Sequence, residues 1–270
     1  MGLFDKLFNK KEKVSPAHEE DWDFYFCNVE DIIGSFFVDL GLKQIAAQND
    51  KPNLVWVSLK MNNPKPDGLS SEEEFDRLSA IEDRLQEFLS NKHKTLYAGR
   101  LTTNGYRNYY FYLGDPILHD KTISEALVAY PDYSYDFGMN EDENWKTYFE
   151  FLYPDPRQYQ SIQNRKVVDN LEKGGDPLTK ARPVDHWIYF KTENDRNTFL
   201  SKIKDLNFSI VDQRKINSRD GHPYSLQISR IDLVDYNSVD DYTLLLWELA
   251  TESDGDYDGW ETSIEKSGSV

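Results

Sequence analysis

The feature that most constrains the fold is a switch between two hydrophobic spacings, which recurs along the chain. Segments rich in β-branched and aromatic residues suit strands, and they alternate with segments whose apolar residues recur every three or four positions, as on one face of a helix. From Leu54 the order is strand, helix, strand, strand, helix, strand, and the same order recurs from His186. This pattern predicts an α+β fold with two ferredoxin-like βαββαβ domains, each a two-layer sandwich of helices on an antiparallel sheet.

A helix and a hairpin are the clearest elements of the first domain. Ser71 is the predicted N-cap of the helix, and Glu74 completes a capping box. Farther along, Asn104-Gly105 stands between two strand-like segments, which is a strong signal for a hairpin. Strands are also expected at DWDFYF, GSFFVDLGL, LVWVSLKM, YSYDFG and WKTYFEFL.

Two helices with predicted caps define the second domain. Thr192 and Asp195 form a capping box at the first helix, and Ser238 is expected to cap the second. Between them, YSLQISRI alternates apolar and polar residues, so one face of the sheet is expected to meet solvent. His186 lies in a strand, where a hydrogen-bonded core histidine is favoured over a general base.

Residues 155–182 differ from the domains on either side. A polar amphipathic helix, ended by Gly174-Gly175, predicts a helical linker there. The expected organisation is a flexible leader at 1–15, a first domain at 16–154, the linker, and a second domain at 183–270. Trp145–Glu150 and Trp260–Glu265 share the pattern W-x-T-x-apolar-E, which is expected if each segment forms the last strand of its domain.

The chain is strongly acidic, with a formal net charge of -17 and a pI near 4.7. Such a surface repels phosphate, so direct nucleic-acid binding would forgo the counterion release that usually drives it. A basic protein partner fits the charge, and so does a surface whose charge simply maintains solubility.

The composition also bears on the compartment. Cys27 is the single cysteine, so the chain forms no internal disulfide and a reducing cytoplasm is expected. No apolar run is long enough to span a bilayer, so no integral membrane association is expected. The leader places Leu3, Phe4, Leu7 and Phe8 on one helical face, which leaves surface contact with a membrane and a frayed leader as alternatives.

The segment Asp254–Glu265 matches the calcium-loop pattern of an EF-hand. Only five residues follow Glu265, too few for the exiting helix of such a loop. An acidic turn from a helix into a strand is therefore favoured over a calcium site. The five histidines lie far apart in the sequence, so no metal site is predicted.

Enzymatic function has weak support in the sequence. The motifs GxSxG, GxGxxG and the P-loop do not occur, so no cofactor is predicted. The 48 acidic residues still allow an alternative, a hydrolase or nuclease whose carboxylates, Asp258 among them, hold a divalent ion in a cleft.

Two resemblances narrow the interpretation. The segments DHWIYF, LNFSI and YDGWET resemble the bacterial regulator of ribonuclease E activity B, over roughly Val184–Lys266. The segments PDGLSSEEEF, GRLTTNGYRNYYFYL and ENWKTYFEFLYPDP are similar to the domain of unknown function 695. The first resemblance implies a non-catalytic, acidic protein that binds the basic scaffold region of ribonuclease E and lowers its activity on RNA.

The sequence and the resemblance together predict a cytoplasmic, non-enzymatic regulator that binds a basic protein segment. The residues predicted to contact the partner are Asp256, Tyr257, Asp258, Trp260 and Glu261. Tyr257 and Trp260 have an alternative role as core residues of the last strand, because aromatic side chains on strands usually pack.

Overall fold

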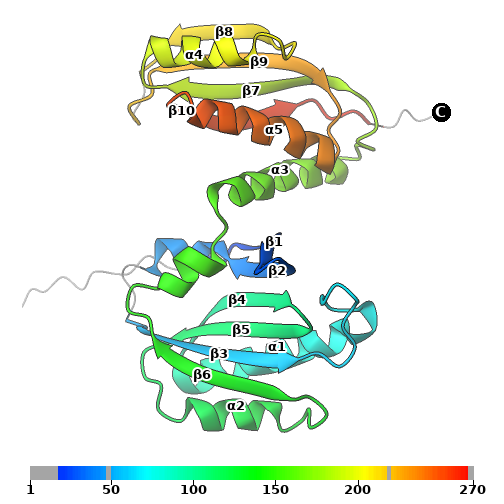
Figure 1. Cartoon of the computed structure of the whole chain (residues 1–270), viewed down its shortest axis with the longest axis vertical. Helices are drawn as coiled ribbons and strands as arrows, with labels where there is room; N and C mark the ends of the chain where they lie inside the picture. Colours follow the sequence, from blue (N-terminus) through cyan, green and yellow to red (C-terminus); the bar gives the residue numbers. More distant parts are fainter. Residues whose placement is uncertain (1–17, 47–49, 218–219, 267–270) are drawn as a thin grey trace, which may run out of the picture. The chain divides into compact units, whose positions relative to one another are not determined.

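The computed structural model describes residues 18–46, 50–217 and 220–266. The predicted leader at 1–15 lies outside these residues. The chain divides into two compact units, residues 1–154 and 155–270, each with an antiparallel sheet and helices (Figure 1). The fold class is therefore α+β, as the sequence predicts.

The first unit is built on a six-stranded sheet with the order β1-β2-β4-β5-β3-β6. From β3 onward its elements follow the predicted order of strand, helix, strand, strand, helix, strand, and the hairpin of β1 and β2 extends the sheet beside β4. The bounds are β1 Trp22–Val29, β2 Ile32–Asp39, η1 Leu40–Gln44, β3 Asn53–Lys60, α1 Glu72–His93, β4 Leu96–Thr103, β5 Tyr106–Leu113, α2 His119–Leu127, β6 Tyr135–Glu141 and η3 Tyr148–Leu152.

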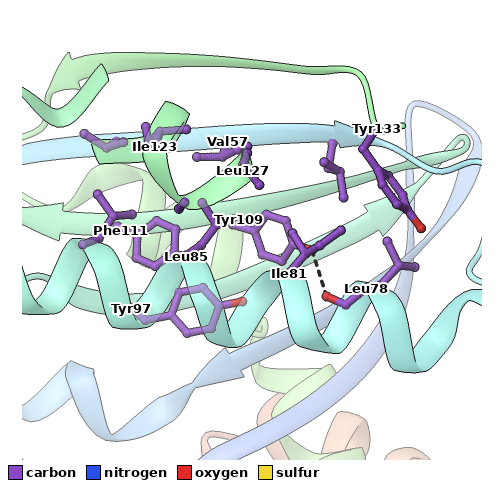
Figure 2. Close-up of a cluster of buried hydrophobic side chains, with 14 of the residues drawn as sticks. Val57, Leu78, Ile81, Leu85, Tyr97, Tyr109, Phe111, Ile123, Leu127 and Tyr133 are labelled. Atoms are coloured by element: carbon purple, nitrogen blue, oxygen red, sulfur yellow. Dashed lines mark hydrogen bonds between the residues drawn. The ribbon is translucent and has the colours of Figure 1, made fainter. Parts of the chain in front are cut away.

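Helices α1 and α2 share one face of this sheet, where their apolar side chains form a single buried cluster with those of β3 and β5. Figure 2 shows Leu78 and Leu85 of α1 against Tyr109 and Phe111 of β5. The hydroxyl of Tyr109 donates a hydrogen bond of 3.4 Å to the carbonyl oxygen of Leu78. The opposite face of the sheet is therefore available to other segments of the first unit.

The start of α1 is where the sequence predicts it, but the predicted capping box is not formed. Ser71 is the N-cap, and its side chain makes no capping hydrogen bond. The buried carboxylate of Glu74 instead accepts the backbone N–H groups of Asn62 and Asn63, each at 2.7 Å. Glu74 therefore fixes the loop that enters the helix.

The prediction of a strand at Trp145–Glu150 is wrong, because this segment is helical and leads into η3. Its buried residues Trp145, Tyr148 and Leu152 recur at helical spacing, and they pack on the face of the sheet opposite α1 and α2. There the indole of Trp145 stacks on the ring of Tyr112, with ring centroids 3.8 Å apart. The sequence echo with Trp260–Glu265 therefore has no structural counterpart, because Trp260 lies in a strand.

The second unit is built on a four-stranded sheet with the order β10-β7-β9-β8. Helices α4 and α5 cover one face, where Phe199 and Leu246 pack against Ile188 and Ile228. The bounds are α3 Pro156–Lys173, β7 Arg182–Phe190, α4 Glu193–Ile203, β8 Ser209–Lys215, β9 Tyr224–Asp232, α5 Tyr236–Thr251 and β10 Gly255–Thr262.

Caps were predicted for two helices of this unit, and one of the two predictions is correct. The capping box of Thr192 and Asp195 is formed, with both of its hydrogen bonds present. Helix α5 begins earlier than predicted, because Asp235 is the N-cap and its side chain accepts the N–H of Ser238. An aspartate three residues upstream thus takes the role that Ser238 was expected to play.

The helix that the sequence analysis treats as a linker belongs to the second unit. Helix α3 starts with a capping box between Asp155 and Gln158. Its side chains Val168 and Leu171 are buried in one cluster with Tyr242 of α5 and Trp260 of β10. Helix α3 is therefore part of the hydrophobic core of this unit.

Candidate functional site

The last strand, β10, sends its side chains to two different environments. Tyr257 and Trp260 are buried, with exposed fractions of 6% and 8%, and they belong to the core clusters under the helices. Asp256, Asp258 and Glu261 are exposed on the opposite face of the sheet. Of the five predicted contact residues, these three present their side chains to solvent, whereas the two aromatic residues pack in the core.

A β-bulge between Tyr257 and Gly259 sets this arrangement. Without it, Asp258 and Glu261 would point to opposite faces, because they are an odd number of residues apart. Gly259 has a φ of +135°, and a Cβ added there would meet no atom within 4 Å. The glycine is thus needed for the backbone conformation of the bulge and not for space.

On the buried side of β10, Tyr257 meets His186 of β7. The Tyr257 hydroxyl and the Nδ1 of His186 are 2.8 Å apart and share a hydrogen bond. Burial, and then the charge of Arg230, lowers the pKa of His186 to about 3. The histidine is neutral at physiological pH, so its prediction as a hydrogen-bonded core residue is confirmed.

Trp260 is tied to α3 through Asn164, which is 2% exposed. The indole Nε1 of Trp260 donates to the Oδ1 of Asn164 at 3.1 Å. The Nδ2 of Asn164 in turn donates to Asp240 at 2.8 Å and to Thr243 at 2.6 Å, both on α5. This buried network fixes α3 beside the edge strand β10.

The outward face of β7 completes the site. Asp185, Trp187 and Tyr189 are half-buried there, and they alternate with fully buried residues. In the register of the two strands, Glu261 lies opposite Asp185, and Asp256 lies opposite Tyr189. We call the surface formed by Asp185, Trp187, Tyr189, Asp256, Asp258 and Glu261 the acidic-aromatic face.

The electrostatics of this face affect Tyr189 directly. Its pKa is raised, first by burial and then by the negative charge of Asp258. The carboxylate therefore lies close enough to the phenol for its field to act on it. A cation bound here would meet carboxylates and aromatic rings together, a combination that favours guanidinium and ammonium groups.

A groove of about 510 Å³ runs between α3 and the acidic-aromatic face. Gln160, Gln163 and Asn170 of α3 line one side, and Trp187 and Asp258 line the other. Trp260, although mostly buried, also lines this groove. The groove could hold an extended polar segment beside the carboxylates.

The contribution of β7 to this face was not among the predictions from the sequence. The alternation seen in YSLQISRI also occurs in VDHWIYF, where it places Asp185, Trp187 and Tyr189 on one side of the strand. The missing information was the pairing of β7 with β10, because pairing between strands far apart in the sequence is not visible in local spacing.

The structure does not assemble a calcium loop from Asp254–Glu265. Residues 255–262 form β10, Asp254 pairs with Lys191 at 3.6 Å, and the N–H of Glu265 donates to Asp176 at 2.7 Å. Within the described parts of the chain, no group of three or more His, Cys, Asp or Glu residues could hold a metal ion. Asp258, the carboxylate named for a metal-dependent hydrolase, belongs to no such group among those residues.

The described helices also bear on membrane insertion. Over residues 18–46, 50–217 and 220–266, no helix combines the length and the apolar composition that crossing a bilayer requires.

Comparisons with known proteins place both halves of the chain. Residues 20–153 match a family of unknown function, DUF695, and residues 161–262 match the family described as regulator of ribonuclease activity B. No curated protein matches the chain. A crystal structure of an unknown protein from Galdieria sulphuraria is 10% identical and covers 77% of this chain and 96% of its own, with a TM-score of 0.22. The N-terminal part of the chain thus matches the DUF695 family and the C-terminal part matches the family described as regulator of ribonuclease activity B, in the order that the sequence predicts.

Proposed function

We propose that the second unit regulates a ribonuclease, with ribonuclease E or a related RNA-processing assembly as the target, by binding a basic segment of it on the acidic-aromatic face. The family match supports regulation of a ribonuclease. The observation that carries the mode of binding is the arrangement of four carboxylates, Asp185, Asp256, Asp258 and Glu261, around Trp187 and Tyr189.

The charge of the protein explains how binding could lower activity on RNA. A net charge of -17 disfavours direct contact with RNA, whereas it attracts the basic segments that ribonucleases use to hold RNA. An acidic protein on such a segment competes with RNA for the same positive charges. In this proposal the protein acts by occupying a surface and carries out no reaction itself.

Two further assignments accompany this function. We assign a ferredoxin-like βαββαβ arrangement to each unit, supported by the two strand orders β4-β5-β3-β6 and β10-β7-β9-β8 and by the shared order of helices and strands. We place the protein in the cytoplasm, because a chain with a single cysteine suits a reducing compartment and the proposed ribonuclease partner acts there.

The test is calorimetric titration of the full chain with a synthetic peptide from the basic segment of the host's ribonuclease E. We expect binding that weakens as salt rises, because exposed charge pairs are screened. The double variant Asp258→Asn/Glu261→Gln should bind about two- to thirtyfold more weakly, since each exposed charge pair contributes about 0.2 to 1 kcal/mol.

A matched control removes the same number of charges elsewhere on the second unit. Asp205 and Asp241 are exposed and lie outside the acidic-aromatic face. The variant Asp205→Asn/Asp241→Asn should bind the peptide as the unaltered protein does. Equal weakening in the two double variants, or binding that does not respond to salt, would contradict a specific role for the acidic-aromatic face.

A further inference from the structure

The face of the first unit's sheet opposite α1 and α2 carries a hollow of about 600 Å³ that the proposed function does not use. Its floor is formed by strands β3, β5 and β6, and one wall is formed by the helical segment that ends in η3. The lining residues are Leu54, Trp56, Tyr110, Asn140, Lys146, Thr147, Glu150 and Phe151. A volume of this size is typical of pockets for small molecules, about 300 to 1,000 Å³.

The aromatic floor of the hollow depends on a glycine. Trp56 lies between Tyr110 on β5 and Gly138 on β6 in the register of the sheet. A Cβ at Gly138 would lie 2.6 Å from the indole ring, so the absence of a side chain allows the ring to lie over β6. Tyr110 packs edge-on against Phe151, with ring centroids 6.2 Å apart. The floor is therefore a pair of aromatic rings held in place by their neighbours.

Two hydrogen-bond donors of this floor lack partners in the described parts of the chain. Burial raises the pKa of Tyr110 to about 12, and no hydrogen bond of its hydroxyl or of the Trp56 indole N–H is present among those residues. Nearby aromatic groups on the same face are satisfied. The hydroxyl of Tyr112 donates to Asp142 at 2.7 Å, and the indole of Trp145 donates to the carbonyl of Lys51 at 3.0 Å.

We propose that this hollow binds a planar heteroaromatic small molecule, which stacks on Trp56 and Tyr110 and accepts hydrogen bonds from their polar groups. The hollow supplies apolar contact through Leu54 and Phe151, and the ion pair of Lys146 and Glu150, at 3.5 Å, lies at its rim. A mostly apolar pocket with a few convergent polar groups is the usual form of a small-molecule site. The site is independent of the acidic-aromatic face, which belongs to the other unit.

The test uses quinoline, a planar ring system whose nitrogen accepts a hydrogen bond, and the full chain labelled with ¹⁵N. The indole N–H resonance of Trp56 is assigned by its loss in Trp56→Phe. We expect quinoline to shift this resonance with a Kd of about 1 mM or tighter. Indole, whose ring nitrogen is a donor only, should bind more weakly.

Two variants separate binding in the hollow from a general effect on the fold. Tyr110→Phe keeps the ring and removes the hydroxyl, so quinoline should bind about fivefold more weakly. Tyr106→Phe, on the same strand but outside the hollow, should leave the affinity unchanged. The indole resonance of Trp145 reports whether each variant keeps the fold of this face.

Gly138→Ala provides a test that does not depend on the hydrogen bonds. The added Cβ would displace the Trp56 ring and reshape the floor, so the shift caused by quinoline should be lost or strongly reduced. The proposal is wrong if quinoline leaves the Trp56 resonance unmoved, or if Tyr110→Phe and Gly138→Ala bind it as the unaltered protein does. Because the readout is a resonance of the first unit, these results do not bear on the basic peptide.

Discussion

The indole nitrogen of Trp260 donates a hydrogen bond of 3.1 Å to the side-chain oxygen of Asn164, and this bond joins the last strand to α3. Asn164 also donates to Asp240 and Thr243 of α5, so one buried amide links three elements. A buried polar group that is left without its partner costs much more than the hydrogen bond itself contributes. Loss of this network should therefore destabilise the second unit.

Asn164→Ala should destabilise the second unit by about 3 kcal/mol, because the buried indole N–H of Trp260 loses its acceptor and Asp240 loses the donor that Asn164 supplies. The measurement is urea unfolding of the full chain, followed by tryptophan fluorescence. Asn170→Ala, at an exposed position on the same helix, is the control and should change the unfolding free energy by about 0.5 kcal/mol or less. Equal effects of the two substitutions would contradict the importance of the buried network.

The buried His186 should make the stability of the second unit depend on pH. Its pKa is about 3 in the folded protein and near 6.5 when the chain is unfolded, so the unfolded state binds a proton first as the pH falls. The contribution of the neutral ring is fully present above pH about 6.5 and decreases toward pH about 3, by about 1.4 kcal/mol per pH unit. Unfolding free energies measured from about pH 7 down to about pH 4 should show this slope.

His186→Gln removes the titrating group and should flatten the slope in that range. His222→Gln is the control, since His222 is only half-buried and its Nδ1 lies near the backbone carbonyl of Asp220. A slope that persists unchanged in His186→Gln would assign the pH dependence to other groups.

The ion pair of Asp176 and Arg182, at 2.7 Å, is buried on both sides. Burial alone would raise the pKa of Asp176, but the N–H groups of Glu265 and Leu178 and the charge of Arg182 hold it below its usual value. Asp176→Asn should destabilise the second unit by about 3 kcal/mol, because it leaves a buried guanidinium without its counter-ion.

The double variant Asp176→Asn/Arg182→Met tests that explanation. It removes the unpaired charge, so it should be more stable than Asp176→Asn alone in the same urea experiment. A double variant that is less stable than the single one would show that the packing of Arg182 matters more than its charge.

Gly259→Ala should destabilise the second unit by about 1 to 2 kcal/mol, because φ of +135° is strained for any residue with a side chain. No atom lies near the added Cβ, so the effect would come from the backbone alone. The same variant should weaken binding of the basic peptide, since the bulge places Asp258 and Glu261 on one face. Unchanged stability would mean that the strand relaxes into another register without cost.

Two features that depend on neighbouring residues were predicted correctly from the sequence. The turn Asn104-Gly105 has the positive φ angles, 50° and 80°, that its two residue types favour. The cap of α4 likewise rests on two residues three positions apart. The segment after Trp145 was not predictable, because its aromatic residues suit a strand or a helix, and packing on Tyr112 decides between them.

The candidate site was likewise only partly predictable from the sequence. The sequence indicates an acidic end to the chain, and Asp256, Asp258 and Glu261 are exposed there. It does not reveal the bulge, nor that Trp187 and Tyr189 of a distant strand lie beside these carboxylates. Both depend on how β10 pairs with β7, which is a property of the folded sheet.

The smallest fragment of this protein that is expected to fold as the second unit must include helix α3. A fragment that starts at Val184 would expose the surfaces of Val239, Tyr242 and Trp260 that α3 covers, and it would also lose one side of the groove. A truncation at Asp155 keeps these contacts and the capping box that starts the helix. Division of the chain for separate expression should therefore be made before α3, at the boundary between Pro154 and Asp155.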